Sequence, residues 1–136
     1  MGDWVGTHRV EWGETDAAAI VFYPNYFRWF DNATHDLFRA IGLPVDEISR
    51  RGYILPIVEA HARFRAPLAY GDDLELWSRV SEVRNRAFRV EHEVRRGGEA
   101  VVDGYEVRMW VRSNAGHLEP ALIPEEVRRL IEPDGS

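Results

Sequence analysis

Apolar and polar residues alternate along this chain with two different periods, and the longer period marks the helices. From Pro24 to Ile41, apolar residues recur every three or four positions, and Gly42 provides a stop. Pro24 suits a first helical position because its missing N–H is not needed there. This spacing predicts one long helix with a wide, deeply buried apolar face. Shorter helices are predicted from Val45 to Arg51 and at residues 124–131.

The shorter period, a strict alternation of apolar and polar residues, predicts strands. It occurs in five segments, at residues 7–14, 57–67, 73–83, 87–96 and 99–113. Gly97 and Gly98 lie between the last two segments and favour a tight hairpin there. The order is therefore a strand, a long helix, a small helix and four long antiparallel strands. We expect an α+β fold in which an antiparallel sheet wraps around one long central helix.

Strands that alternate in polarity have only one face with which to cover a helix, so the other face should meet water or a partner. In the last strand, this rule places Tyr105 and Val107 toward the helix and Glu106 and Arg108 away from it. The outer strands also leave backbone groups open, which a second copy could pair edge to edge. We therefore expect a homodimer formed by sheet extension.

Composition narrows the class of protein. The 136 residues, 45% of them apolar, suffice for one domain spanning residues 1–136. No apolar segment is long enough for a membrane span and no secretory signal is found, so we expect a cytoplasmic protein with no membrane partner. A net charge of −6 argues against nucleic-acid binding. All 17 basic residues are Arg, so any phosphate must be bound by guanidinium groups.

Several kinds of chemistry lack their motifs. The chain has no G-x-S-x-G elbow, no H-E-x-x-H pattern and no G-x-G-x-x-G loop before a helix, so we expect no serine triad, metal or nucleotide cofactor. Asp31 and His35 are spaced as an acid–base pair, but a surface contact between neighbouring turns explains them better. His92 is assigned to the apolar face of its strand, while His61 lies on a polar face where it could contact a ligand.

Asp16 is distinguished by its position. It lies about eight residues before the long helix and is followed by the uncharged run "AAAIVFY", which is unusually apolar for an exposed loop. Asp is common where backbone N–H groups need a local acceptor, so a turn-making role is favoured from spacing alone. On that interpretation Glu14 and Thr15 are simple loop residues. The alternative is a carboxylate that works at the rim of an apolar binding wall.

The segment "WGETDAAAIVFYPNYFRWFDNA" resembles the signature of hotdog-fold acyl-CoA thioesterases of the 4-hydroxybenzoyl-CoA thioesterase family. The resemblance continues through "RGYILPIVEAHARFRAPLAYGDDLEL" and "EVRNRAF" and covers about two-thirds of the chain well. It implies the hotdog fold, a homodimer that is often paired into a homotetramer, and hydrolysis of an acyl-CoA substrate, with an aromatic acyl group such as hydroxybenzoyl as the first choice.

The resemblance also implies roles for individual residues. Asp16 matches the catalytic carboxylate, acting as a nucleophile or as a base that activates water, and the backbone N–H of Tyr23 matches the group that polarises the thioester carbonyl. The acyl group would contact Ile20, Val21 and Phe22 of the apolar run, together with Pro56 and Ile57 of a neighbouring subunit. His61 is a further substrate-binding candidate because of its place on a polar strand face. The phosphates of coenzyme A would meet Arg84 and Arg86, with Arg108 and Arg112 as weaker candidates, although exposed Arg needs no special role.

One position departs from the family pattern. Ala19 replaces a commonly found Gly, and an Ala that must adopt a positive φ would be strained. Alternatives to aromatic acyl-CoA hydrolysis are hydrolysis of short or branched aliphatic acyl-CoA and non-catalytic binding of acyl-CoA or acyl-carrier protein. A third is a hydratase that uses His35 with Asp31 or Asp36.

Overall fold

The computed structural model of the protein describes residues 3–133. In this part of the chain the elements follow in the order β1 (Trp4–Arg9), a 3₁₀ turn η1 (Trp12–Glu14), α1 (Pro24–Ala40), α2 (Val45–Arg50), β2 (Tyr53–Ile54), β3 (Ile57–Phe64), β4 (Asp73–Val83), β5 (Ala87–Arg96), β6 (Glu99–Met109), β7 (Val111–Asn114), β8 (His117–Pro120) and α3 (Glu125–Ile131).

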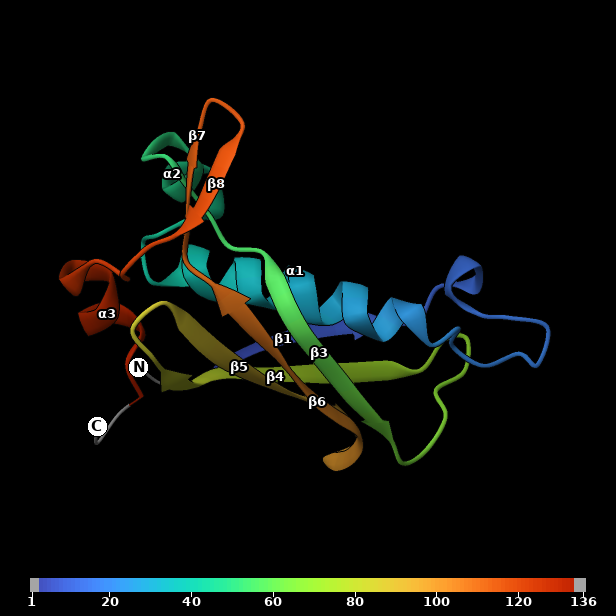
Figure 1. Ribbon diagram of the computed structural model, residues 1–136. Coiled ribbons are helices and arrows are strands. Elements are labelled where there is room, and N and C mark those ends of the chain that lie inside the picture. Colours follow the sequence, from blue (N-terminus) through green and yellow to red (C-terminus); the bar gives the residue numbers. More distant parts are fainter. Residues whose placement is uncertain (1–2, 134–136) are drawn as a thin grey trace.

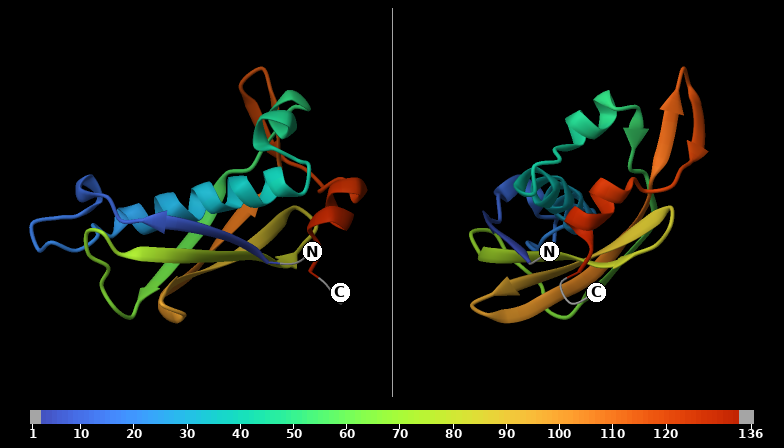
Figure 2. Two further views of the ribbon diagram at one scale, coloured as in Figure 1. Left: turned by 180° about the vertical axis from the view of Figure 1, so that it is seen from behind. Right: turned by 90° about the vertical axis from the view of Figure 1, so that its left-hand side faces the viewer.

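The five longer strands form one antiparallel sheet, and α1 lies across one of its faces (Figure 1). The strand order is β1-β4-β5-β6-β3, so β1 and β3 are the two edges. Seen from two further sides, the sheet curves beneath the helix and leaves its other face open (Figure 2). The predicted α+β hotdog architecture, one antiparallel sheet around one long helix, is therefore confirmed.

The apolar face of α1 forms the centre of the core. Phe30, Leu37 and Phe38 are fully buried, and burial of each such side chain contributes roughly 1.5–3 kcal/mol. The first half of the helix packs with Leu74 and other residues in one apolar cluster, and the second half packs in another with residues of α2 and α3. The wide buried face predicted from the helical spacing is thus confirmed.

A buried polar group separates these two clusters, and it overturns the predicted orientation of the last strand. Glu106 and Arg108 of β6 are 1% and 4% exposed and face α1, not water. The Thr34 hydroxyl of α1 donates to Glu106 Oε1 at 2.5 Å, and Arg108 donates to Glu106 Oε2 at 2.9 Å. The alternation of the strand was identified correctly, but its polar residues are inward because they satisfy one another and the helix. Tyr105 is on the outer face, where its ring stacks on that of His61.

Three predicted strands have different bounds. The strand predicted at residues 57–67 ends at Phe64 as β3. Residues 7–14 do not form one strand: β1 ends at Arg9, and the chain then turns, with the Glu14 amide donating to the Glu11 carbonyl at 3.0 Å. The segment 99–113 is broken at Trp110, whose amide donates to the Arg86 carbonyl at 2.7 Å. The first of these bonds closes a local turn that replaces the sheet ladder, whereas the second joins the segments that flank the last β5–β6 pair, Ala87 with Met109.

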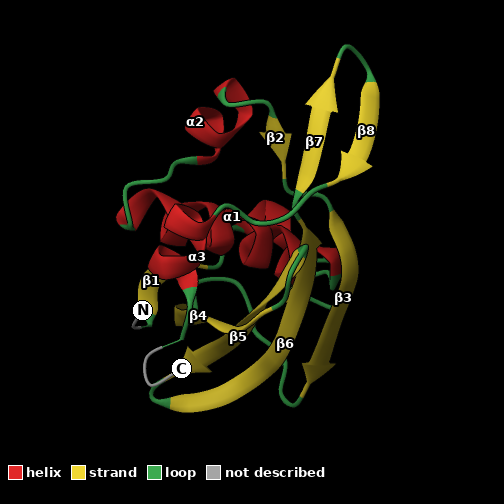
Figure 3. Cartoon of the chain, turned by 60° about the vertical axis from the view of Figure 1, so that its left-hand side comes forward, coloured by secondary structure: helices red, strands yellow, loops and turns green. Residues whose placement is uncertain are grey.

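Beyond Trp110, the chain leaves the main sheet and forms a second one. β7 pairs with β2 and β8 in a small three-stranded sheet. The β7–β8 hairpin projects past α1 beside α2 (Figure 3). No helix within residues 3–133 has the length and apolar character needed to cross a membrane.

The edge strand β3 is exposed along nearly all of its length. Seven of its eight residues are classed as exposed, including Ile57 at 43%, Val58 at 55% and Phe64 at 49%. One edge of β3 pairs with β6, and within residues 3–133 the other edge has no strand beside it. An open edge that carries apolar side chains is a pairing surface.

Candidate active site

Asp16 lies in a tight turn ahead of α1. Its amide donates to the Ile20 carbonyl and its carbonyl accepts from the Ala19 amide, both at 2.9 Å. Its Oδ1 accepts from the Ala18 amide at 2.9 Å. The side chain is otherwise exposed, and no hydrogen bond to Oδ2 is found among residues 3–133. Asp16 therefore does shape its turn, as spacing alone suggested, while one oxygen remains open to a ligand.

The departure from the family pattern falls at a strained position of this turn. Ala19 has a φ of 64°, in the left-handed region that costs a residue with a Cβ roughly 1–2 kcal/mol. The hydrogen bond from its amide to Asp16 holds it there. The conditional expectation that Ala would be strained here is met.

Glu14, treated above as a simple loop residue, connects several parts of the chain. Its Oε1 lies 2.8 Å from His8 Nε2 and accepts from the Glu11 amide at 2.8 Å, while its Oε2 accepts from Trp29 Nε1 at 2.8 Å. Burial disfavours the charge, but the three donors together outweigh it, so the pKa of Glu14 lies below its usual range. The acidic position in the family signature was the one sequence signal for this residue.

The start of α1 offers one unpaired backbone donor. Pro24 has no N–H, and the amides of Asn25 and Tyr26 donate to the carbonyls of Phe22 and Tyr23 at 3.0 and 3.2 Å. The Phe22 amide donates to the Glu14 carbonyl at 2.9 Å. Within the described chain, the Tyr23 amide has no such partner. A free N–H at a helix start carries partial positive charge and can stabilise an oxyanion.

The apolar run before α1 is only partly covered in the single chain. Val21 is 5% exposed, whereas Ile20, Phe22 and Tyr23 are 36%, 49% and 59% exposed. The backbone of Val21 is fixed by a hydrogen bond from its amide to the Leu68 carbonyl at 2.8 Å. The run thus presents an apolar surface beside Asp16, and a partner or ligand is needed to cover it.

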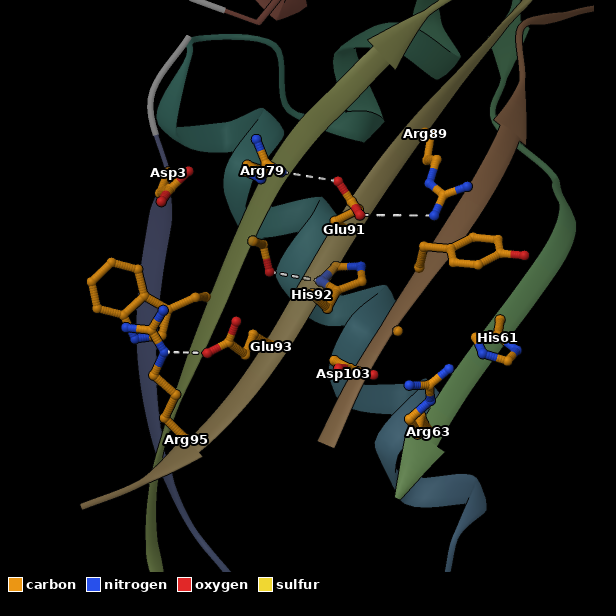
Figure 4. A pocket seen from close by; sticks show the side chains of 14 residues that line it. Asp3, His61, Arg63, Arg79, Arg89, Glu91, His92, Glu93, Arg95 and Asp103 are labelled. Atoms are coloured by element: carbon orange, nitrogen blue, oxygen red, sulfur yellow. Dashed lines mark hydrogen bonds and ion pairs between the residues drawn. The ribbon is translucent and has the colours of Figure 1, made fainter. Parts of the chain in front are cut away.

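The remaining predicted acyl-contacting residues lie elsewhere in this chain. Pro56 and Ile57 are at the start of β3, whereas the ring of Phe64, at its end, is 5.3 Å from that of Tyr26 in the first turn of α1. His61 projects from the sheet face away from α1 and stacks on Tyr105 at 5.3 Å (Figure 4). One chain therefore does not bring these residues to Asp16.

The predicted phosphate-binding arginines differ from one another. Arg84 and Arg86 are exposed in the β4–β5 turn; Arg84 donates twice to Glu82, whereas no partner of the Arg86 guanidinium is found among residues 3–133. Arg108 was a poor candidate: it is buried, and its Nη2 lies 2.6 Å from Asp31 Oδ1. Its guanidinium has no surface left for a phosphate. Arg112 is exposed and donates to the Tyr53 hydroxyl at 3.1 Å.

The turn that carries Arg84 and Arg86 lies far from Asp16. Strand β4 begins at Asp73, which pairs with Arg9 next to the Asp16 loop, and ends at Val83 beside this turn. Eleven residues of strand span roughly 33 Å. A single chain thus keeps the two sets of groups at opposite ends of the sheet.

The positions of His92 and His35 match the structural roles predicted for them from the sequence. His92 is 2% exposed in the core, and His35 Nε2 lies 3.5 Å from Asp31 Oδ1 with both side chains about 40% exposed. Because Asp31 is already bound by Arg108, the pair offers a poor acid–base site.

A hollow of about 510 Å³ on the outer sheet face is lined by charged residues such as Arg79 and Glu91 and does not include Asp16 (Figure 4). No group of three or more His, Asp or Glu within residues 3–133 is arranged to hold a metal ion.

Residues 10–131 match the family model described as the thioesterase-like superfamily. This range includes the Asp16 turn, all of α1 and strands β3 to β6. The chain belongs to this superfamily. The match extends over both ends of the sheet, so the candidate groups described above all lie within it. The resemblance noted from the sequence is confirmed.

Individual relatives are similar to this chain over nearly their whole length. The 4-hydroxybenzoyl-CoA thioesterase of Pseudomonas sp. strain CBS-3 is 32% identical over 130 residues, which are 90% of this chain and 92% of that protein. A 1,4-dihydroxy-2-naphthoyl-CoA hydrolase of Prochlorococcus marinus strain MIT 9303 is 29% identical, with 98% and 93% covered.

Solved structures of thioesterases are also similar to this chain in fold. A gentisyl-coenzyme A thioesterase superposes with a TM-score of 0.83 and 36% identity, covering 94% of this chain and 98% of that one. A mutant 4-hydroxybenzoyl CoA thioesterase complexed with 4-hydroxybenzoyl CoA gives a TM-score of 0.88 and 30% identity, covering 96% and 99%.

Proposed function

We propose that this protein hydrolyses an aromatic acyl-CoA thioester, of the hydroxybenzoyl-CoA type, to the free acid and coenzyme A. The relatives named above act on hydroxybenzoyl, gentisyl and dihydroxynaphthoyl thioesters, all of which carry hydroxylated aromatic acyl groups. The observation that carries the proposal within this chain is the placement of the Asp16 carboxylate in the turn that leads to the free Tyr23 amide.

The chemistry assigned to these two groups is simple. Asp16 either attacks the carbonyl carbon as a nucleophile or takes a proton from a water molecule whose oxygen attacks that carbon. The carbonyl oxygen gains negative charge as the tetrahedral intermediate forms, and the Tyr23 N–H at the positive end of α1 donates to it. Collapse of the intermediate breaks the C–S bond and releases the thiolate of coenzyme A. When water has attacked, the other product is the free acid; when Asp16 has attacked, it is a mixed anhydride on Asp16, which water then hydrolyses to the free acid and the restored carboxylate.

The proposed site is completed by a second copy through the open edge of β3. Antiparallel pairing of two β3 strands along their length places the start of one beside the end of the other. The partner's Pro56 and Ile57 would then approach Phe64 and Tyr26, next to the exposed apolar run. We propose a homodimer of this kind, further paired into a homotetramer, as a cytoplasmic enzyme built from one hotdog domain of residues 1–136.

A second copy also offers an explanation for the position of the phosphate-binding candidates. Arg84 and Arg86 lie at the β3-start end of the sheet, which the same pairing brings toward the Asp16 end of the other chain. We assign the phosphates of coenzyme A to these two residues, with Arg86 as the stronger candidate because its guanidinium is unpaired within residues 3–133. His61 faces the outer side of the sheet and receives no acyl contact in this arrangement.

The test is a panel of aromatic and aliphatic CoA thioesters followed by release of free thiol. We expect the hydroxylated aromatic esters to have the highest kcat/KM, and we expect Asp16→Asn to lower kcat by about 10² to 10⁴. Binding without thiol release would instead support a non-catalytic acyl-CoA domain. A preference for short aliphatic esters would contradict the proposed aromatic substrate but would still support thioester hydrolysis.

A further inference from the structure

Glu14 is the most highly connected residue of the segment that carries Asp16. Its carboxylate binds β1 through His8, the η1 turn through the Glu11 amide and the second turn of α1 through Trp29. Its carbonyl accepts from the Phe22 amide and from Asn25 Nδ2, both at 2.9 Å. One residue thus joins the strand before the Asp16 turn to the helix after it.

The environment of Glu14 favours a carboxylate. Its side chain is 17% exposed, and the atoms it meets are the N–H donors of His8, Glu11 and Trp29. A carboxylate can accept all three hydrogen bonds because it has acceptor sites on both oxygens and no donor. An amide in its place would turn an NH₂ group toward at least one of these donors and lose that bond.

The connections of Glu14 reach both groups that the proposed reaction uses. Asp16 follows Glu14 by two residues, and within residues 3–133 its side chain has a single hydrogen bond, from the Ala18 amide. Phe22, whose amide is held by the Glu14 carbonyl, immediately precedes Tyr23. Both ends of the reacting geometry are therefore fixed relative to the same residue.

We propose that Glu14 is a positioning residue that holds the Asp16 carboxylate at its working distance from the Tyr23 amide. It touches no reacting atom in this scheme and acts through Asp16. The inference rests on the hydrolytic function proposed above. Displacement of a reacting group by about 1 Å can cost a hundredfold in rate, so a residue that sets this distance affects kcat more than KM.

The experiment is a double-mutant cycle with Glu14→Gln and Asp16→Asn, measured on one aromatic acyl-CoA ester. We expect Glu14→Gln alone to lower kcat by about 10- to 100-fold while KM changes less than about threefold. In the Asp16→Asn background the same change should lower kcat by less than about twofold, because the group that it positions is already gone. Glu99→Gln removes a carboxylate from an exposed position in β6 and serves as the matched control.

The outcomes separate the two proposals. If Asp16→Asn leaves kcat unchanged, the assignment of Asp16 fails, and with it the function of Glu14. If Asp16→Asn is strongly impaired but the two losses multiply independently, or if Glu14→Gln lowers only the melting temperature, Glu14 is purely structural. Should Glu14→Gln not fold, Trp29→Phe removes one of its three donors and keeps an aromatic ring, and it enters the same cycle with the same expected non-additivity.

Discussion

The carboxylate of Glu106 and the imidazole of His92 lie 3.1 Å apart with 1% and 0% of their side chains exposed. The Ser78 hydroxyl contacts His92 Nδ1 at 2.7 Å, and the ring of Phe30 stacks on the imidazole at 4.5 Å. The consistent arrangement is a neutral His92 that donates from Nε2 to the charged Glu106 and accepts from Ser78. The pair lies between the two apolar clusters, so the register of α1 on the sheet depends on it.

This pair makes the free energy of unfolding depend on pH. Burial lowers the pKa of His92 in spite of Glu106, so an unfolded imidazole binds a proton below about pH 6.5 that the buried one rejects. Burial opposes ionisation of Glu106, but His92 and Arg108 outweigh it and its pKa lies below the usual range. Below about pH 4.5, the unfolded carboxyl group therefore takes up a proton that the folded one does not. In both cases the unfolded state binds more protons than the folded state, so the free energy of unfolding decreases as the pH is lowered.

Urea unfolding at steps between pH 7.5 and pH 4 measures this decline. We expect a first loss below about pH 6.5 that disappears in His92→Gln and a second loss below about pH 4.5 that remains. His117→Asn is the control, since this imidazole is 77% exposed. Equal stability of the parent protein at pH 7.5 and pH 5 would contradict the neutral assignment of His92.

Arg108 is expected to contribute to stability and not to coenzyme A binding. Its Nη2 lies 2.6 Å from Asp31 and 2.9 Å from Glu106, and its Nη1 donates to the Leu55 carbonyl at 3.1 Å. Arg108→Met should lower the free energy of unfolding by about 3–5 kcal/mol, because the Glu106 charge stays buried without its cationic partner. Arg112→Met, at an exposed position, should cost less than about 1 kcal/mol. A stable Arg108→Met protein with a raised KM for CoA esters would reverse this assignment.

The phosphate assignment predicts different effects for two neighbouring arginines. Arg86→Ala should raise KM for a CoA ester by about tenfold, and Arg84→Ala by less, because the Arg84 guanidinium must leave Glu82 to bind a phosphate. KM for the same acyl group on a short thiol that lacks the nucleotide should be unchanged in both variants. An equal rise for both thioesters would refute the role of this turn in phosphate binding.

The strained turn before α1 can be relaxed by one substitution. Ala19 and Ala115 both have positive φ, at 64° and 48°. Replacing either by Gly should raise the free energy of unfolding by about 0.5–1 kcal/mol. Ala19→Gly should also lower kcat by roughly two- to fivefold because the Asp16 turn gains freedom, whereas Ala115→Gly, at the tip of the β7–β8 hairpin, should not. Identical kcat values for the two variants would show that the backbone strain at Ala19 has no effect on catalysis.

Periodicity predicted the elements of this fold well but not the use of every face. The spacing around Phe30 and Leu37 defines the buried side of α1 without ambiguity. Along β6, alternation shows that Glu106 and Arg108 share a face, yet it cannot show that this face meets the helix, because their burial depends on Thr34 and His92 from distant segments.

The candidate site was predictable to a similar degree. Asp16 and Tyr23 were found through the family signature, whereas the role of Glu14 depends on its contacts with His8 and Trp29. These contacts exist only once β1 and α1 are packed together.

The open edge of β3 predicts an assembly that can be broken by charge. Val58 is 55% exposed on a strand whose outer edge is unpaired in the described part of the chain, so sedimentation at micromolar concentration should give at least twice the chain mass of 15.7 kDa. Val58→Lys should shift the protein toward the monomer and lower kcat, because the exposed apolar run beside Asp16 would lose the partner's Pro56 and Ile57. Val5→Lys, on the opposite edge strand at 40% exposure, is the matched control and should leave both the mass and kcat unchanged. A fully active monomer would show that one chain forms the whole site and would remove the need for β3 pairing.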